Sequence, residues 1–558
     1  MSCIGRTRSI SLSGLRGTVV DVEADIAQSL PGFTLLGLPD QSLQESRDRI
    51  RSAARNAGQP LTRRHLTVNL LPPGVHKRGA GHDLAIVLAA YAAEGRVSGV
   101  HGPVFLAELG LDGTLHGPPD MVALAMAAVD AGLPDMVVAA DAVDQAALVP
   151  GARVRGFTHL HHVIHAFGGR PEPVPGVEPR PVLVHPGEEP SGPSLPDDGP
   201  RTSGVRPALS SSSPAGDRPV EAGPDRGRGP AMRLPADDVV PDLSDVVGQW
   251  EARYALEVAA AGGHHLLLSG RPGAGKTMLA ERLPGILPVL DDRTALEAAA
   301  LASLRSDGPA PTRLDTRPPF QAPHHSASMP ALVGGGSGLA RPGAASLAHG
   351  GVLFLDEAPE FDRRSLEALR QPLESGEVVL HRSRGTVRYP ARFQLVLAAN
   401  PCPCGYGEGA GSRCRCTVLQ RRRYAERLSG PLLDRVDLQV SVAPVTGAEL
   451  GSSGAGEDSA TVAARVRDAV GAQHERWACA NARMPGALLR RGRFAVPPAA
   501  RAAADSAVDA GWLSARGHAR VLRLAWTVAD LRGAAVPSSE DVDVALHLRR
   551  RQDEEEAA

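Results

Sequence analysis

One eight-residue stretch constrains the fold of this 558-residue chain more than any other: Gly-Arg-Pro-Gly-Ala-Gly-Lys-Thr at 270–277. The apolar run 265–269 precedes it, and the helix-forming segment 278–283 follows it. Glycines placed between a strand and a helix let backbone N–H groups approach an anion at the helix N-terminus. The stretch therefore predicts an α/β fold with a buried parallel sheet and a phosphate site at the end of one strand.

Lysine is nearly absent from the chain, which makes the lysine of this loop informative. Only Lys77 and Lys276 occur among 60 basic residues, and the other 58 are arginine. A compact ammonium on a thin stem reaches between β- and γ-phosphates, whereas a planar guanidinium is too wide. We expect ATP and Mg²⁺ as cofactors, with Thr277 offering its hydroxyl to Mg²⁺. The expected nucleotide-binding residues of the loop are Gly270, Arg271, Pro272, Gly273, Ala274, Gly275, Lys276 and Thr277.

Two further apolar runs end in polar residues. The run 351–355 precedes Asp356 and Glu357, and the run 393–399 precedes Asn400. We expect Asp356 to hold Mg²⁺ together with Thr277, and Glu357 to polarise an attacking water. Asn400 is expected to orient that water from the other side. Acidic pairs at strand ends are common by chance. These residues support a nucleotide site because they follow the glycine loop in order, at the ends of successive apolar runs.

Hydrolysis of ATP also needs positive charge at the γ-phosphate beyond one lysine. Arg435, in the segment 428–437, is a candidate finger that a neighbouring subunit would supply. Arg516 and Arg520, in a predicted C-terminal helix, are candidate nucleotide sensors. Because the chain has 58 arginines, spacing alone does not distinguish these three from surface residues.

Composition divides the chain into four parts. Residues 1–168 alternate short apolar strands with alanine-rich helices, which predicts a compact α/β domain. Residues 169–240 are rich in Pro, Gly and Ser and predict a disordered linker. Residues 241–440 carry the motifs above, and residues 441–558 predict a helical lid with amphipathic segments at 461–478, 498–510 and 515–532.

The bulk properties exclude several classes of protein. The net charge is −2, so nothing in the overall charge indicates a nucleic-acid or membrane partner. No apolar run approaches the ~18 residues that cross a bilayer. The segment 1–17 is polar and lacks the apolar core of a signal peptide. These features predict a cytoplasmic enzyme without a membrane partner.

Four of the six cysteines lie within 15 positions: Cys402, Cys404, Cys414 and Cys416. Four thiolates from two short knuckles can form a tetrahedral Zn²⁺ site. Each pair has the spacing C-x-C, which is tighter than the common C-x₂-C of zinc sites. Reduced thiols in a loop beside Asn400 are the alternative.

Several motifs together resemble one family. The segments are 323–328 (Pro-His-His-Ser-Ala-Ser), 333–336, 342–343, 346–349, 400–406 and 428–438, with 37–40, 45–49 and 68–70 upstream. They are similar to the magnesium-chelatase-like AAA+ ATPases, specifically the ComM/YifB group. The resemblance covers nearly the whole chain except the predicted linker.

The resemblance implies a ring ATPase, a homo-hexamer with ATP bound between subunits. It implies a helicase or branch-migration motor on single-stranded or branched DNA, acting during recombination of incoming DNA in natural transformation. It also implies a hairpin near 374–388, whose Arg382, Arg384 and Arg388 could track DNA phosphates. An ordinary solvated hairpin is the alternative there. A chelatase motor subunit and a protein-remodelling ATPase are the alternative functions.

By the same resemblance, residues 1–168 are similar to the ribosomal-S5-type fold of the Lon protease domain. That type of proteolysis uses a Ser–Lys pair. The loop where the serine would lie, 77–83, contains no serine, and 104–132 contains no lysine. The residues therefore argue against a protease and favour a structural or DNA-binding module.

Overall fold

The computed structural model describes residues 4–27, 30–37, 40–72, 80–177, 183–184, 241–305, 311–336, 340–382, 385–407, 413–447, 449 and 456–549. Most of the predicted linker 169–240 lies outside these ranges, as do Lys77 and Arg384. No helix in the described ranges has the length and apolar character needed to cross a bilayer.

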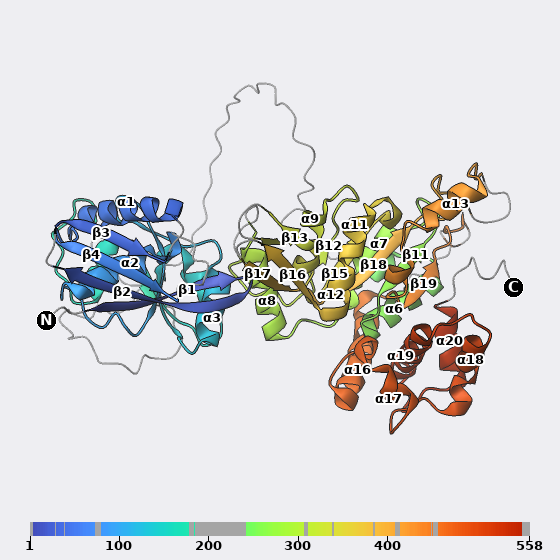
Figure 1. The fold of residues 1–558 in the computed structure, drawn as a ribbon. Coiled ribbons are helices and arrows are strands. Elements are labelled where there is room, and N and C mark those ends of the chain that lie inside the picture. The colour runs from blue at the N-terminus through green and yellow to red at the C-terminus, as the bar shows by residue number, and fades with distance from the viewer. Residues whose placement is uncertain are drawn as a thin grey trace, which may run out of the picture. The chain divides into compact units, whose positions relative to one another are not determined.

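The N-terminal domain is built on an eight-stranded mixed sheet with the order β10-β9-β8-β5-β1-β2-β4-β3 (Figure 1). Its strands are β1 (Gly5–Ser13), β2 (Arg16–Ala27), β3 (Gly32–Leu36), β4 (His65–Leu71), β5 (Val104–Leu106), β8 (Asp135–Ala139), β9 (Arg153–Phe157) and β10 (Leu183–Val184). A two-stranded ribbon, β6 (Glu108–Leu109) and β7 (Leu115–His116), lies beside it. Its helices are α1 (Asp40–Asn56), α2 (Asp83–Ala93), α3 (Met121–Asp130), α4 (Val143–Ala146) and α5 (Leu160–Ala166).

Helices α2 and α3 cover opposite faces of this sheet. Both are apolar nearly all round, as expected of helices with little exposure to solvent. On the α2 side, Thr7 of β1 donates a hydrogen bond to the carbonyl of Ala85 at 2.8 Å. On the α3 side, Ile10 of the same strand joins the core that contains Met121. The alanine-rich helices predicted for this domain are thus present, and α2 and α3 form its core.

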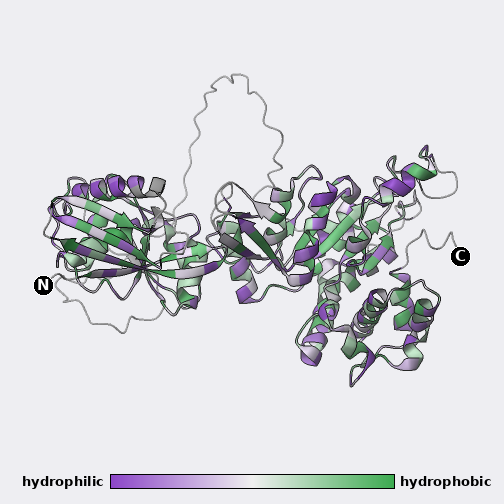
Figure 2. Cartoon of the chain, in the orientation of Figure 1, coloured by the Kyte–Doolittle hydropathy of each residue, from purple (hydrophilic) through white to green (hydrophobic). Residues whose placement is uncertain are grey.

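The second sheet is parallel throughout, with the order β12-β15-β18-β11-β19. Its strands are β12 (Phe320–Gln321), β15 (Val352–Leu355), β18 (Gln394–Ala399), β11 (Leu266–Ser269) and β19 (Leu438–Ser441). Nearly all residues of β15, β18 and β11 are buried, and Figure 2 shows these strands as predominantly hydrophobic. The three apolar runs that the sequence singled out are therefore confirmed as neighbouring strands of one parallel sheet.

Helices surround this sheet and connect its strands. They are α6 (Trp250–Gly262), α7 (Lys276–Ile286), α8 (Asp292–Ser303), α9 (Met329–Val333), α10 (Ala344–Leu347), α11 (Arg363–Ala368), α12 (Arg370–Ser375), α13 (Val418–Ala425) and α14 (Gly430–Leu433). Two small antiparallel pairs interrupt the connections, β13 (Gly334–Gly335) with β14 (Arg341–Pro342) and β16 (Glu377–Arg382) with β17 (Gly385–Pro390). The second pair is the predicted hairpin. Val378, Val387 and Tyr389 anchor it by burial, and Arg382 and Arg388 are exposed.

The C-terminal part is helical, as predicted. It contains α16 (Ser459–Trp477), α17 (Gly486–Arg490), α18 (Pro498–Asp509), α19 (Ala515–Leu531) and α20 (Ser539–His547). Helix α19 is the central one, with eleven buried residues. Its Trp526 meets Trp477 edge to face, with ring centroids 5.3 Å apart. The apolar side of α19 joins the same core as β11 and α6, so the lid helices extend the hydrophobic core of the parallel sheet.

Candidate functional site

The phosphate-type loop 270–277 joins β11 to α7 at the carboxyl edge of the parallel sheet. Gly273 and Gly275 adopt positive φ angles of 77° and 90°, which residues with a Cβ rarely tolerate. Gly275 is the N-cap of α7, so the first free N–H groups of this helix face the loop. This is the geometry in which backbone donors bind an anion.

Lys276 is held at the centre of the loop. Its Nζ donates hydrogen bonds to the carbonyls of Gly270 at 2.7 Å and Arg271 at 3.1 Å, and to Oδ1 of Asn400 at 3.0 Å. Only 8% of the residue is exposed. The structure therefore joins the loop lysine directly to the polar residue at the end of β18. These neutral oxygens are weaker partners than phosphate oxygens would be.

Thr277 and Asp356 form the second contact across this edge. The hydroxyl of Thr277 donates to Oδ2 of Asp356 at 2.7 Å, and Asp356 follows directly after β15. A hydroxyl and a carboxylate are oxygen ligands of the kind that Mg²⁺ prefers. The two residues thus fit the predicted magnesium site by their chemistry and by their proximity.

Glu357 lies beside this pair in a strained backbone conformation. Its φ angle is 50°, in the left-handed region that few residues other than glycine adopt. Its carboxylate is half exposed and lies 3.1 Å from Nδ1 of His325. Strain of this kind persists only where the surroundings fix it, and it often marks a functional position. His325 belongs to the Pro-His-His-Ser-Ala-Ser motif, and sequence reasoning gave it no individual role.

Arg435 lies at the opposite, amino edge of the same sheet, three residues before β19. It is buried, donates to the carbonyl of Pro431 at 2.6 Å, and forms an ion pair with Glu374. Residues of β11 and β19 pair in register from Leu266 with Leu438 to Ser269 with Ser441. A strand of four residues spans about 13 Å, so Arg435 and Lys276 are separated by at least the length of a strand.

Arg516 and Arg520 of α19 also lie at this amino edge. Arg516 donates to Asp434 at 3.3 Å, and Arg520 forms an ion pair with Asp437 and donates to the carbonyl of Arg435 at 3.1 Å. The structure thus places both predicted sensors with Arg435 and does not bring them to Lys276. A cavity of about 500 Å³ opens here. Its basic lining residues are Arg392, Arg435, Arg483, Arg516 and Arg520.

Asp437 anchors this arginine group. Burial alone would raise its pKa, but the charge of Arg520 and the nearby imidazole of His264 hold the pKa well below the usual range of a carboxyl group. His264 is fully buried and its Nε2 lies 2.8 Å from the hydroxyl of Thr527 in α19. The ionised Asp437 therefore joins the lid helix to the amino edge of the sheet.

Comparison with known proteins assigns this architecture to a family. The family model "Magnesium chelatase, subunit ChlI" matches residues 242–450, "Subunit ChlI of Mg-chelatase" matches 22–142, and "Magnesium chelatase, subunit ChlI C-terminal" matches 456–549. YifB of Escherichia coli is 37% identical over 96% of this chain and 95% of its own length. Competence protein ComM of Haemophilus influenzae is 36% identical over 93% of this chain and 92% of its own length.

The chain belongs to the magnesium-chelatase-like ComM/YifB family. The resemblance that its motifs predicted is thereby confirmed. A protein of Mycobacterium tuberculosis, described as the uncharacterized protein Rv2897c, is 42% identical over 98% of this chain and 99% of its own length. These relatives span the N-terminal domain as well as the parallel-sheet core and the helical lid.

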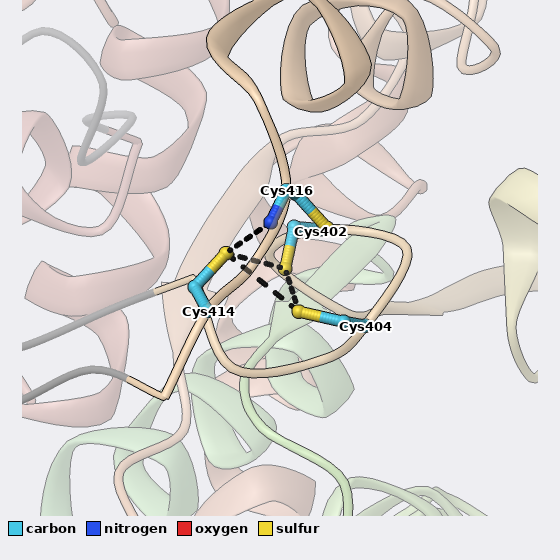
Figure 3. A group of neighbouring side chains, drawn as sticks. All are labelled: Cys402, Cys404, Cys414 and Cys416. Carbon is cyan, nitrogen blue, oxygen red and sulfur yellow. Dashed lines mark hydrogen bonds between the residues drawn. The ribbon is translucent and has the colours of Figure 1, made fainter.

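Within this family member, the four clustered cysteines lie next to the carboxyl edge (Figure 3). Their sulfur atoms all lie within 4.8 Å of one another. Among the described residues, this is the one group of cysteines, histidines and carboxylates whose ligand atoms converge closely enough for a metal ion. The predicted set is therefore assembled in space.

Two partners of the site escaped sequence reasoning. Gln249 has a left-handed φ of 53° and donates its side-chain amide to the carbonyl of Ala274 in the phosphate-type loop. Glu374, named only as the start of the predicted hairpin, pairs with Arg435 across 61 positions of sequence. Neither residue belongs to a motif with a recognisable spacing, so only the fold could reveal these contacts.

Proposed function

We propose that this family member is an ATP-hydrolysing AAA+ ring motor that acts on DNA. One observation carries the proposal: the phosphate-type loop and the arginine group lie on opposite edges of one parallel sheet. Neither edge holds all the groups that phosphoryl transfer requires. The two edges complement each other when the amino edge of one copy faces the carboxyl edge of the next.

At the carboxyl edge, each residue has a separate task in this proposal. Lys276 exchanges its present oxygen acceptors for β- and γ-phosphate oxygens of ATP. Thr277 and Asp356 hold Mg²⁺, which supplies positive charge to the same phosphates. Glu357 accepts a proton from the attacking water, and Asn400 orients that water.

At the amino edge, Arg435 serves the neighbouring subunit. Its guanidinium would neutralise charge that develops on the γ-phosphate of that subunit. Five arginines line the cavity beside it, together with the carboxylates of Glu374, Asp434 and Asp437, so the cavity carries an excess of positive charge. A head-to-tail interface whose rotation closes forms a ring, and the family resemblance gives a homo-hexamer as the expected ring.

DNA is the proposed substrate of the motor, in single-stranded or branched form. Hairpin β16–β17 carries the exposed side chains of Arg382 and Arg388, and guanidinium groups suit phosphate contacts. The relative from Haemophilus influenzae carries the name competence protein. This name supports a role in branch migration or unwinding during recombination of incoming DNA.

A chelatase-type motor subunit is the second candidate, favoured by the names of the three matching family models. Full-length protein should be assayed for ATP hydrolysis alone, with single-stranded DNA and with branched DNA, and for strand displacement. Lys276→Ala is the matched control. Stimulation by DNA and strand displacement are expected. Hydrolysis without either response to DNA would contradict the DNA motor and leave the chelatase-type or a protein-remodelling motor.

A further inference from the structure

The cysteine-bearing segment 402–416 forms a compact sulfur cluster rather than a disulfide framework. The Sγ atoms of Cys402 and Cys404 are 3.3 Å apart, those of Cys402 and Cys414 are 3.7 Å apart, and those of Cys404 and Cys414 are 3.6 Å apart. A disulfide would need about 2.05 Å. Four thiolates around Zn²⁺ at about 2.3 Å place their sulfurs roughly 3.8 Å apart. The spacing of these three sulfurs is close to that of a tetrahedral metal site, and the Sγ of Cys416 lies within 4.8 Å of each of them.

The burial of the cysteines and the sequence between them also support a bound Zn²⁺. Cys402 is fully buried, and the other three cysteines are partly buried. The intervening stretch 405–413 contains four glycines, at 405, 407, 409 and 411. Glycine loses more conformational freedom on ordering than any other residue. A metal bound at both ends of this stretch offsets that cost by closing the loop, as in small zinc domains.

The cluster touches the catalytic edge directly. Cys402 follows Asn400 by one intervening residue, and Asn400 binds the ammonium of Lys276 at 3.0 Å. Gly405, with φ of 80°, lies so close to the phosphate-type loop that a Cβ there would come within 2.5 Å of Cγ of Pro272. Gly405, which directly follows the first cysteine pair, therefore packs on the loop that surrounds Lys276.

A second connection runs through α13. Cys416 is followed by Thr417, which caps α13 with its hydroxyl and forms a capping box with Gln420. Tyr424 of this helix is buried, which raises the pKa of its hydroxyl, and the nearby backbone of Asn400 opposes that rise. Both ends of the cysteine segment are thus tied to Asn400, one through the chain and one through Tyr424.

We propose that Cys402, Cys404, Cys414 and Cys416 bind one Zn²⁺ and that this ion fixes Asn400 and Pro272 in their positions around the nucleotide. Zinc binding stabilises the cysteine-bearing segment. This segment in turn contacts the phosphate-type loop at Pro272 and, through Asn400, at Lys276. The metal is structural, since four thiolates complete its tetrahedron and leave no position for substrate. The proposed effect on Asn400 and Pro272 rests on the proposed ATP site, whereas the zinc site itself does not.

The first test measures the metal without nucleotide. Full-length protein, purified under reducing conditions without chelator, should contain one zinc per chain by elemental analysis. Protein that is stripped of metal and loaded with Co²⁺ should show the visible d–d bands and sulfur charge-transfer absorption of a tetrahedral thiolate site. Cys404→Ser/Cys414→Ser should lose the zinc, and Cys479→Ser, whose thiol lies outside the cluster, should retain it. Wild-type protein without zinc would overturn the site.

The second test measures the connection to the nucleotide. We expect zinc removal from the folded protein to weaken binding of a fluorescent ADP analogue at least about ten-fold, and added Zn²⁺ to restore it. Gly405→Ala should retain zinc and weaken binding in the same direction, because its Cβ displaces Pro272. If neither zinc removal nor Gly405→Ala changes the affinity for the ADP analogue, the proposed effect of the zinc site on nucleotide binding is wrong, even if the protein contains zinc. Loss of nucleotide binding by zinc-loaded wild-type protein would instead contradict the proposed ATPase.

Discussion

The two edges of the parallel sheet differ in how their chemistry is encoded. The carboxyl edge carries Lys276 and Thr277 at the start of α7, and Asp356 and Asn400 directly after strands, and each contacts another of the set. The amino edge carries Arg435, which is one of 58 arginines and is recognisable only by its neighbours. The carboxyl edge is thus defined by local motifs and the amino edge by contacts between distant segments.

This difference teaches how the proposed motor divides its catalytic groups. Residues that bind one nucleotide can be local, because a loop and two strand ends suffice. In this proposal, residues that contact a neighbour's nucleotide have to be connected to both the helical C-terminal part and the sheet of their own subunit. Arg520 on α19 and Asp437 before β19 provide such a connection between the lid and the sheet.

The largest expected effect tests whether the two edges act between subunits. Arg435→Ala should lower the turnover number of ATP hydrolysis by about 10³-fold, as loss of an arginine finger does, with nucleotide binding retained. Arg467→Ala, an exposed arginine on α16, is the matched control. Steady-state hydrolysis and binding of a fluorescent ATP analogue measure the two quantities.

Mixing variants separates action in trans from action in cis. In an equimolar mixture of Lys276→Ala and Arg435→Ala, half of the subunits have an intact loop and half of those meet an intact arginine. Random assembly into a head-to-tail ring should thus restore about one quarter of the wild-type rate. A mixture as inactive as the separate variants would show that Arg435 does not act across a subunit interface.

The next effect concerns Glu357, the residue proposed to polarise the attacking water at the carboxyl edge. Glu357→Gln should lower hydrolysis by about 10²-fold while ATP still binds, because only proton acceptance is lost. Glu281→Gln, exposed on α7, controls for the loss of a negative charge. Equal losses of hydrolysis and binding would instead assign Glu357 to nucleotide binding.

A third change should alter stability rather than turnover. Asp437→Asn removes the buried, ionised partner of the partly buried Arg520, which costs about 3 kcal/mol of unfolding free energy at pH 7. Because the folded pKa of Asp437 is lowered, its contribution is present above the ordinary carboxyl pKa of about 4 and is lost as pH falls below it. Urea unfolding at several pH values should show this difference shrinking in acid. Asp509→Asn, exposed at the end of α18, should show no such difference.

The smallest expected effect concerns the partner that holds Arg435. Most of the Glu374 side chain, 62%, is exposed, so its ion pair is worth at most about 1 kcal/mol. Glu374→Gln should therefore raise hydrolysis at saturating ATP by no more than about five-fold, because Arg435 is freed for a neighbouring phosphate. Glu475→Gln, on α16, is the control. A decrease would mean that Glu374 positions the guanidinium for its task.

Sequence reasoning succeeded where an element is locally consistent. The runs 265–269, 351–355 and 393–399 are mostly apolar, as strands buried on both faces must be, and all three became neighbouring strands. Strand β1 shows the opposite case. Its Thr7 and Ser9 are buried, and their hydroxyls form hydrogen bonds with the carbonyl of Ala85 and the ring of His82. Because of such polar residues, the sequence of this central strand indicates only a polar N-terminal segment.

The sequence by itself determined the phosphate-type loop, the strands around it and the four-cysteine cluster, because each depends on residues close in the chain. Only the tertiary structure decided that Arg435, Arg516 and Arg520 gather at the far edge of the sheet and that Glu374 pairs with the first of them. The physical reason is the parallel sheet. It brings carboxyl ends of strands to one edge and amino ends to the other, and the partners at the amino edge come from segments 61 to 85 positions apart.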